Sequence, residues 1–278
     1  MTVGARQLWS RERRLATIAL ALPCLAGLVY LIGAGAPTSF SIVNAGALAL
    51  GLIWIAFGRL PDRLFARRML TAGLLLLLAL PLALGPSIDS VSRWISLGGF
   101  TVHAGMLTIP LLVVLAAQDR TAAPLIFLAA MILCFAQPDT ASLLALSCAA
   151  LALWRAQRDW KVGALAGLGL FAALGASFNG ALPPQAFVEN VLPDLWASSS
   201  FAALALGCAL LASLAIVVAG GPENRSARRA VAGAMAGFVI AAILGPYPYP
   251  LIGYGAAPIL GFALALGGLA RMTVVETG

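Results

Sequence analysis

Long apolar stretches recur along the whole chain, and every second gap between them is basic, whereas the other gaps hold almost no basic residue. Stretches of about 16–21 residues approach the ~20 that a helix needs to cross a bilayer core. They lack the period-two alternation of a membrane β-barrel. The sequence therefore predicts an all-α, polytopic integral membrane protein with about ten transmembrane helices, near residues 15–35, 40–58, 69–85, 103–118, 122–136, 140–154, 162–178, 198–219, 230–246 and 251–270.

Composition supports a single membrane domain over residues 1–278. Hydrophobic residues make up 62% of the chain and charged residues only 10%, whereas a soluble domain of this length exposes far more charge. No soluble module is predicted at either end. Residues 1–35 are not expected to form a cleavable signal peptide, because the apolar run is too long and no small-residue cleavage site follows it.

The distribution of basic residues sets the orientation. If the N-terminus is inside, the inner segments hold every Lys and Arg, from Arg6 to Arg271, except Arg93. The positive-inside rule then predicts that both termini face the cytoplasm of a bacterial inner membrane. The net charge of +7 is therefore expected to face anionic lipid headgroups, and nucleic-acid binding is excluded as the reason for it.

The cysteines give no sign of a metal site or a disulfide framework. They occur singly inside apolar stretches, and no pair has CxxC spacing. We expect them to be small core residues. They are Cys24, Cys134, Cys148 and Cys208.

Few ionisable residues are predicted at the outer face, and Asp139 is the most informative of them. It follows Gln137-Pro138, where one apolar stretch ends and the next begins, so that no loop holds it in water. A carboxylate at the membrane edge is a candidate functional group. The alternative is an N-cap, in which the acid stabilises the free N–H groups of the next helix. The other outer ionisable residues are Asp89, Arg93, His103, Glu189 and Asp194.

Arg93 and Trp94 combine a fixed positive charge with an interfacial aromatic ring. One interpretation is an ordinary aromatic-belt anchor. The other is an arginine that binds phosphate with two parallel hydrogen bonds, as a diphosphate lipid headgroup requires. The position of Arg93 as the one basic residue of the predicted outer face favours the second interpretation.

The last outer turn, residues 245–255, alternates proline with tyrosine before a Tyr-Gly step. Such a segment cannot form a regular helix. Non-helical backbone at membrane depth needs surrounding protein or a wet cavity. We therefore expect a cavity there that is lined by tyrosines and opens outward.

Three outer segments together resemble the SEDS family of cell-wall polymerases, typified by RodA and FtsW, and the resemblance covers the chain from end to end. Residues 93–98 (Arg-Trp-Ile-Ser-Leu-Gly) resemble its Arg-Trp-hydrophobic-x-Leu-Gly motif. Residues 137–139 (Gln-Pro-Asp) match its Gln-Pro-Asp, and residues 248–255 resemble its Pro-x-Pro-Leu-x-x-Tyr-Gly. The motifs occur in the family's order and on the same face of the membrane.

The resemblance implies a glycosyltransferase that polymerises lipid II, or a related lipid-linked glycan, in cell shape or division. Such a reaction needs a base near the acceptor hydroxyl and cations for the leaving diphosphate. The resemblance also implies a class B penicillin-binding protein as partner and a divalent cation, Mg²⁺ or Mn²⁺. The implied substrate-binding residues are Arg93, Trp94, His103, Gln137, Pro248, Pro250 and Tyr254.

More than one acidic residue is a candidate for the base, because the outer loop before the eighth span is shorter than in the family and lacks its Thr-Asp-Phe step. Glu189 is the first candidate and Asp194 the second, although Asp194 also fits a cap of the eighth span; the third alternative is that neither acts. Asp139 would be a structural or metal-side acid. Asp139, Glu189 and Asp194 are the candidate metal ligands.

A charged pair of the family is missing from this chain. Where the family has Gln-Pro-Ser-Glu followed by Lys, residues 103–106 read His-Ala-Gly-Met and Ile109 follows. His103 either replaces the lost polar group or is structural. The missing charges leave open a second function, in which a non-catalytic SEDS relative acts as a scaffold or binds or flips a lipid-linked precursor.

Overall fold

The computed structural model describes residues 10–89, 91–98, 100–179, 182–220 and 224–269. Arg6 and Arg271, two of the predicted inner charges, lie outside these ranges. Apart from one short hairpin, the regular structure of the described residues is helical. The elements are α2 (Arg11–Gly33), α3 (Thr38–Phe57), α4 (Leu64–Leu84), β1 (Trp94–Leu97), β2 (Phe100–His103), α5 (Ala104–Gln118), α6 (Ala123–Ala136), α7 (Thr140–Gln157), α8 (Trp160–Ser177), α9 (Val191–Ser198), α10 (Ser200–Ala219), α11 (Arg225–Leu244) and α12 (Ala256–Leu269).

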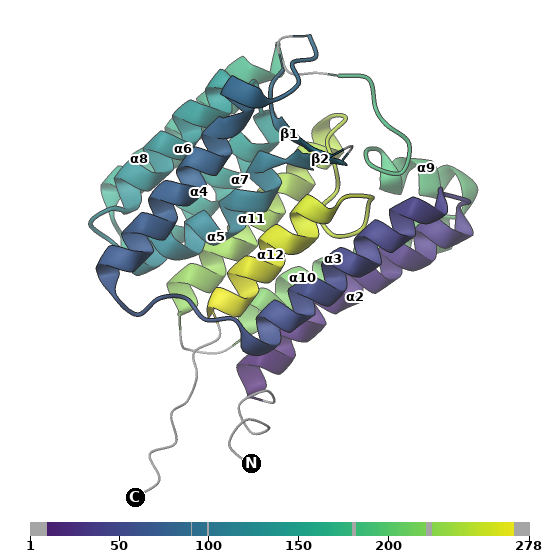
Figure 1. Cartoon of the computed structure of the whole chain (residues 1–278), viewed down its shortest axis with the longest axis horizontal. Helices are drawn as coiled ribbons and strands as arrows, with labels where there is room; N and C mark the ends of the chain where they lie inside the picture. Colours follow the sequence, from purple (N-terminus) through teal and green to yellow (C-terminus); the bar gives the residue numbers. More distant parts are fainter. Residues whose placement is uncertain (1–9, 90, 99, 180–181, 221–223, 270–278) are drawn as a thin grey trace, which may run out of the picture.

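The long helices run side by side as a bundle (Figure 1). The start of α2 and the end of α12 lie at one end of the bundle, and the β1–β2 hairpin and the short α9 lie at the other. The arginine-rich connections lie at the first end, which the charge pattern assigns to the inner face. The hairpin and α9 therefore belong to the outer face.

The surface of the bundle is apolar, as a lipid-facing surface must be. In the part of the chain that the structure describes, six helices are long and apolar enough to span a membrane: α2, α3, α4, α8, α10 and α11. Helices α5, α6 and α12 are shorter but also apolar. Large side chains such as Phe171 and Phe201 are 77% and 82% exposed, which a lipid environment accommodates without cost. The predicted all-α, polytopic membrane protein is confirmed.

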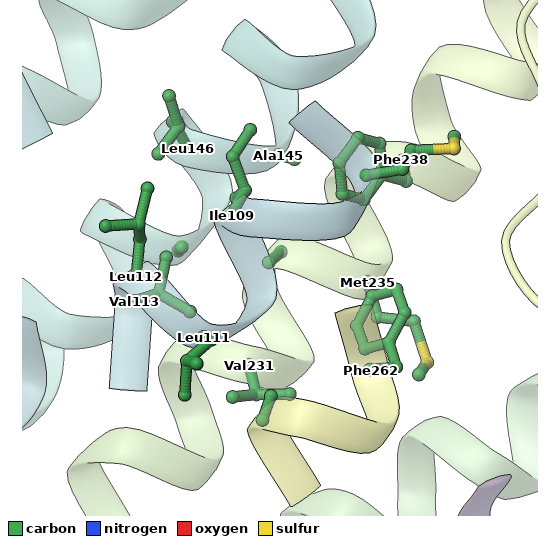
Figure 2. Close-up of a cluster of buried hydrophobic side chains, with 14 of the residues drawn as sticks. Ile109, Leu111, Leu112, Val113, Ala145, Leu146, Val231, Met235, Phe238 and Phe262 are labelled. Atoms are coloured by element: carbon green, nitrogen blue, oxygen red, sulfur yellow. The ribbon is translucent and has the colours of Figure 1, made fainter. Parts of the chain in front are cut away.

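The centre of the bundle is built on close contact between α7 and α11. In Figure 2, residues of α5, α7, α11 and α12 meet in one apolar cluster around Ile109 and Phe238. Gly233 and Gly237 lie one turn apart on α11, and a Cβ on Gly237 would come within 2.5 Å of the Ala145 Cα of α7. This small-xxx-small pattern allows the two backbones to touch, which is how dispersion forces drive helix association in lipid.

Two connections differ from the predicted spans. The chain forms a hairpin at residues 94–103 before α5, where no strand was predicted, because a four-residue strand is too short to give a visible alternation. Residues 245–255 form the predicted irregular segment, and the last helix begins at Ala256 rather than at residue 251.

Replacing Gly237 with alanine is expected to destabilise the protein, because the new methyl group meets the backbone of α7 and the two helices must separate. Overpacking of this kind costs about 1–3 kcal/mol. The measurement is thermal unfolding of the purified protein in detergent. Gly73→Ala is the matched control, since a Cβ at that position would have no atom within 4 Å; an equal loss in both variants would contradict the proposed role of the α7–α11 contact.

Candidate functional site

The β1–β2 hairpin positions the first two polar residues of the outer face. The strands pair antiparallel with Trp94 opposite His103, and the Ala104 amide donates to the Arg93 carbonyl oxygen at 3.1 Å. The turn uses Gly98 at a φ of +55°, a conformation that suits glycine. Arg93 and His103 are therefore neighbours, and the Trp94 and His103 rings meet edge-on with centroids 6.3 Å apart.

Arg93 is a buried cation with unused hydrogen-bond donors. It is only 2% exposed, and its Nε and Nη1 atoms are buried without a hydrogen-bond partner. Its Cζ lies 4.7 Å from the centroid of the Trp94 ring and 5.4 Å from that of Tyr247, so cation–π contacts offset part of the desolvation cost. A guanidinium held in this way is suited to an anionic group, which favours the phosphate interpretation over an interfacial anchor.

His103 and Asp139 cap two helices whose N-termini converge. The Met106 amide donates to the His103 Nδ1 atom at 3.2 Å at the start of α5, and the Ser142 amide donates to Asp139 Oδ1 at 3.1 Å at the start of α7. Asp139 is therefore the N-cap that the sequence offered as one alternative. Gly105 permits the approach, because a Cβ there would lie 3.0 Å from Asp139 Oδ2 and would overlap the Ser142 hydroxyl.

The two caps also face each other through atoms that have no partner. Because His103 Nδ1 accepts a hydrogen bond, the neutral ring carries its proton on Nε2. Nε2 lies 3.6 Å from Asp139 Oδ2, which is too long for a direct hydrogen bond, and both atoms are buried without another partner. Asp139 thus caps α7 with one oxygen and keeps the other free, next to a histidine that also interacts electrostatically with Arg93.

Gln137 fixes the end of α6 against α4. Its Nε2 atom donates to the Leu78 carbonyl oxygen of α4 at 2.5 Å. Pro81 has no N–H, so the carbonyl just before that of Leu78 lacks its usual helical donor, and the bond from Gln137 lies beside this gap in the helix. The side chain is fully buried, and its Oε1 atom has no hydrogen-bond partner. Gln137 therefore has a structural role and leaves one free acceptor at the same face.

Glu189 is held near Arg93 by a tight backbone turn. Phe187 and Asn190 adopt left-handed backbone conformations, and the Gln185 amide donates to Glu189 Oε2 at 2.6 Å. Glu189 is 8% exposed. Burial raises the pKa of Glu189, and the Gln185 amide and the positive charge of Arg93 oppose this rise. Glu189 is therefore close enough to Arg93 for their charges to interact.

Asn44 of α3 ties the proline–tyrosine segment to the same face. Its Nδ2 atom donates to the Gly253 carbonyl oxygen at 2.9 Å, and its Oδ1 atom accepts from the Gly255 amide at 3.0 Å. The Tyr254 amide donates to the Phe187 carbonyl oxygen at 2.7 Å, so the segment is also joined to the turn that holds Glu189. Asn44 was not singled out in the sequence, although an asparagine inside an apolar stretch was an available signal.

The predicted binding residues of this segment differ in their exposure. Tyr254 is half-buried and stacks on the Phe40 ring with centroids 3.7 Å apart. Pro248 is half-buried, whereas Pro250 is buried. Tyr247, which the sequence did not separate from its neighbours, is buried and packs on Arg93.

Asp194 lies apart from Glu189 and His103. It is exposed in the first turn of α9, and it is not among the charges that act on Glu189 or His103. The expectation that it caps the eighth span is wrong, because the Ser199 hydroxyl accepts from the Ala202 amide at the start of α10. The chain reaches α10 through a short helix, which places Asp194 one element too early for that cap.

The described residues contain no group of three or more His, Cys, Asp or Glu side chains arranged to hold a metal ion. The described residues therefore do not by themselves supply a full set of ligands for a metal ion. The divalent cation stays a prediction.

Substitutions of Asp139 separate its capping oxygen from its free oxygen. Asp139→Asn keeps an N-cap acceptor and should unfold close to the wild-type temperature, whereas Asp139→Ala should lose about 1 kcal/mol. Thermal unfolding in detergent measures both. If Asn destabilises as much as Ala does, the free oxygen beside His103, and not the cap, stabilises the fold.

Comparisons with known proteins identify the fold. No protein-family model matches the sequence, and no curated protein matches it. The structure is similar to the rod-shape-determining protein RodA of Thermus thermophilus, with a TM-score of 0.60 and 21% identity over 91% of this chain and 93% of that one. An aspartate-to-alanine mutant of the same RodA gives 0.60 and 20% over 91% and 94%. A chain of a peptidoglycan synthase complex that coordinates polymerization and crosslinking gives 0.56 and 22% over 91% and 95%. This protein therefore has the SEDS-like, multi-pass membrane fold of RodA, as its outer motifs predicted.

Proposed function

We propose that this protein is a SEDS-type peptidoglycan glycosyltransferase, which polymerises lipid II or a related lipid-linked glycan at the outer face of the bacterial inner membrane, in cell shape or division. The observation that carries the proposal is the buried Arg93 at the outer end of a RodA-like fold. It has N–H groups without a hydrogen-bond partner, and its charge interacts with that of Glu189. An anion-binding group beside a carboxylate is what transfer from a lipid diphosphate needs.

In the proposed reaction Glu189 is the general base. It takes the proton from a sugar hydroxyl of the acceptor, and the hydroxyl oxygen forms a bond to the anomeric carbon of the donor. The bond from that carbon to the diphosphate oxygen breaks with inversion, and the lipid diphosphate leaves with the electron pair. Arg93 stabilises the charge that develops on the leaving oxygens through its free N–H groups. Burial raises the pKa of Glu189 toward the working pH, which makes a carboxylate a more effective base.

The remaining residues hold this pair in place. Asp139 and His103 fix the N-termini of α7 and α5 on one side, and Tyr247 packs on the Arg93 guanidinium on the other. Tyr254 joins the proline–tyrosine segment to the turn of Glu189. We assign the half-buried Trp94 and Pro248 to the wall that the glycan contacts, whereas the buried Pro250 has a structural role.

A class B penicillin-binding protein is the proposed partner, because a glycan polymerase needs an enzyme that cross-links its product. One of the similar structures comes from a complex that combines polymerization with crosslinking, which supports this proposal. A divalent cation is a further proposal, with Asp139 and Glu189 as the available carboxylates, because Asp194 lies apart from both.

A second candidate function is supported by the α5 residues that stand where the family carries charge. Met106 and Ile109 are 1% and 0% exposed and belong to the apolar core, so this part of the bundle offers no charged group to a substrate. A SEDS relative without that pair would bind or flip a lipid-linked precursor, or act as a scaffold, without polymerising it.

Replacing Glu189 with glutamine should abolish polymerisation of labelled lipid II by the purified protein, assayed with its penicillin-binding protein and with Mg²⁺ or Mn²⁺ present or chelated. The ionised carboxylate is the base, so the wild-type rate should fall as the pH is lowered through a pKa above the ordinary 4.5 of glutamate. Asp194→Asn, which changes an exposed acid of the adjacent helix α9, should keep full activity.

The outcomes separate the two functions. Product from the Glu189→Gln protein would show that another group is the base. If the wild type binds lipid II but makes no glycan under any metal condition, the non-catalytic function is favoured.

Replacing Arg93 with alanine should weaken binding of a lipid diphosphate by about tenfold to a hundredfold, because hydrogen bonds to charged groups are each worth about 1.5–3 kcal/mol. Arg93→Lys keeps the charge but loses the planar fork, and should restore only part of the affinity. The measurement is equilibrium binding of a fluorescent polyprenyl-diphosphate glycan in detergent. Arg155→Ala, at the inner face, is the control; unchanged binding in Arg93→Ala would leave Arg93 as a structural cation.

A further inference from the structure

A groove of about 470 Å³ lies between α4 and α6 at the inner end of the bundle, with α5 behind it. It does not belong to the outer site. Its inner end is polar and includes Arg67, Arg68 and Thr121, whereas Ala72 and Leu75 line the part that runs toward the membrane centre. From Arg68 to Leu75 the helix rises by about 10 Å. The groove thus joins a cationic end to an apolar end, along the direction in which a lipid lies.

The two arginines are held in place and keep donors free. Arg67 Nε donates to the Pro61 carbonyl oxygen at 2.6 Å, and Arg68 Nε donates to Asp119 Oδ2 at 2.8 Å. Arg68 Nη2 also donates to the Thr121 hydroxyl at 3.1 Å. Within the described residues no hydrogen bond engages Arg68 Nη1 or either Nη atom of Arg67. The guanidinium groups are therefore oriented by their Nε atoms, and their remaining N–H groups stay available at the inner end of the groove.

Asp119 does not cancel the attraction of the groove for an anion. Its Oδ2 atom accepts from Arg68, and its Oδ1 atom accepts from the Thr121 hydroxyl at 2.7 Å and the Ala122 amide at 3.2 Å. The hydrogen bond from Arg68 lowers the pKa of Asp119 to about 2, so the carboxylate is ionised and committed to these partners. Arg67 then remains as the uncompensated charge of the lining, next to the first turn of α4, which has no side-chain cap.

A second groove of nearly equal size shows what is special about the first. It measures about 460 Å³ and lies between α7 and α8, where Trp154, Trp160 and small residues such as Gly167 line it. None of its lining residues is charged. The first groove therefore differs from the second by its charged inner end, in which the two arginines outnumber Asp119.

We propose that the α4–α6 groove binds an anionic phospholipid of the inner leaflet. The lipid phosphate accepts hydrogen bonds from the free Nη atoms of Arg67 and Arg68. One acyl chain lies along Ala72 and Leu75 and against Leu125 of α6. The inference is independent of the proposed glycosyltransferase activity, and a protein that makes no glycan would still bind this lipid.

The experiment is native mass spectrometry of the full chain released from nanodiscs that contain equal amounts of phosphatidylglycerol and phosphatidylcholine. The wild type should retain phosphatidylglycerol selectively. The Arg67→Gln/Arg68→Gln double variant should retain about 25-fold less, since each arginine near a membrane surface contributes roughly a factor of five.

A steric variant keeps the test independent of the Arg68–Asp119 ion pair. Ala72→Trp leaves every charged side chain in place and fills the groove, and it should also lose the lipid. Ala164→Trp fills the uncharged α7–α8 groove and is the matched control, which should retain phosphatidylglycerol as the wild type does.

Two results would overturn the proposal. One is equal retention of phosphatidylglycerol by the wild type and Ala72→Trp. The other is displacement of phosphatidylglycerol by an equimolar polyprenyl phosphate, which would assign the groove to a single-chain isoprenoid lipid instead.

Discussion

The outer half of this protein depends on the rule that backbone polar groups at membrane depth must find partners inside the protein. Among the helices that begin there, α5 and α7 have buried N-termini capped by a side chain, His103 for α5 and Asp139 for α7. The irregular segment before α12 is satisfied in the same way by Asn44. These three side chains therefore help to hold the starts of α5 and α7 and the proline–tyrosine segment in place.

These same partners create the chemistry of the site. An aspartate that caps a helix with one oxygen has a second oxygen to offer, and a histidine that accepts through Nδ1 presents its proton on Nε2. Arg93 adds a positive charge, stabilised by the faces of Trp94 and Tyr247. The same packing arrangement therefore caps two helices and leaves a cluster of polar groups whose charges interact and whose hydrogen bonds are incomplete.

Part of the fold and of the candidate site could be predicted from the sequence, and part could not. The apolar stretches, the basic gaps and the Gln-Pro-Asp step predicted the membrane fold and the outer position of Asp139, because these signals are local. The hairpin at residues 94–103 was missed, and Asp194 was wrongly allowed as a cap of α10, because both depend on where the chain turns rather than on composition. Asn44 was missed because its partners lie more than two hundred residues away.

The sequence by itself determined that the chain crosses a membrane many times, which end of the bundle is basic, and that its outer motifs resemble those of the SEDS proteins. Hydrophobicity and charge fix these properties residue by residue, so no knowledge of packing is needed. Only the tertiary structure decided that Arg93 is buried with free donors, that Glu189 lies within its electrostatic range, and that Asp139 faces His103. Burial and charge proximity arise from contacts between segments far apart in the chain, and those contacts exist only once the helices have packed.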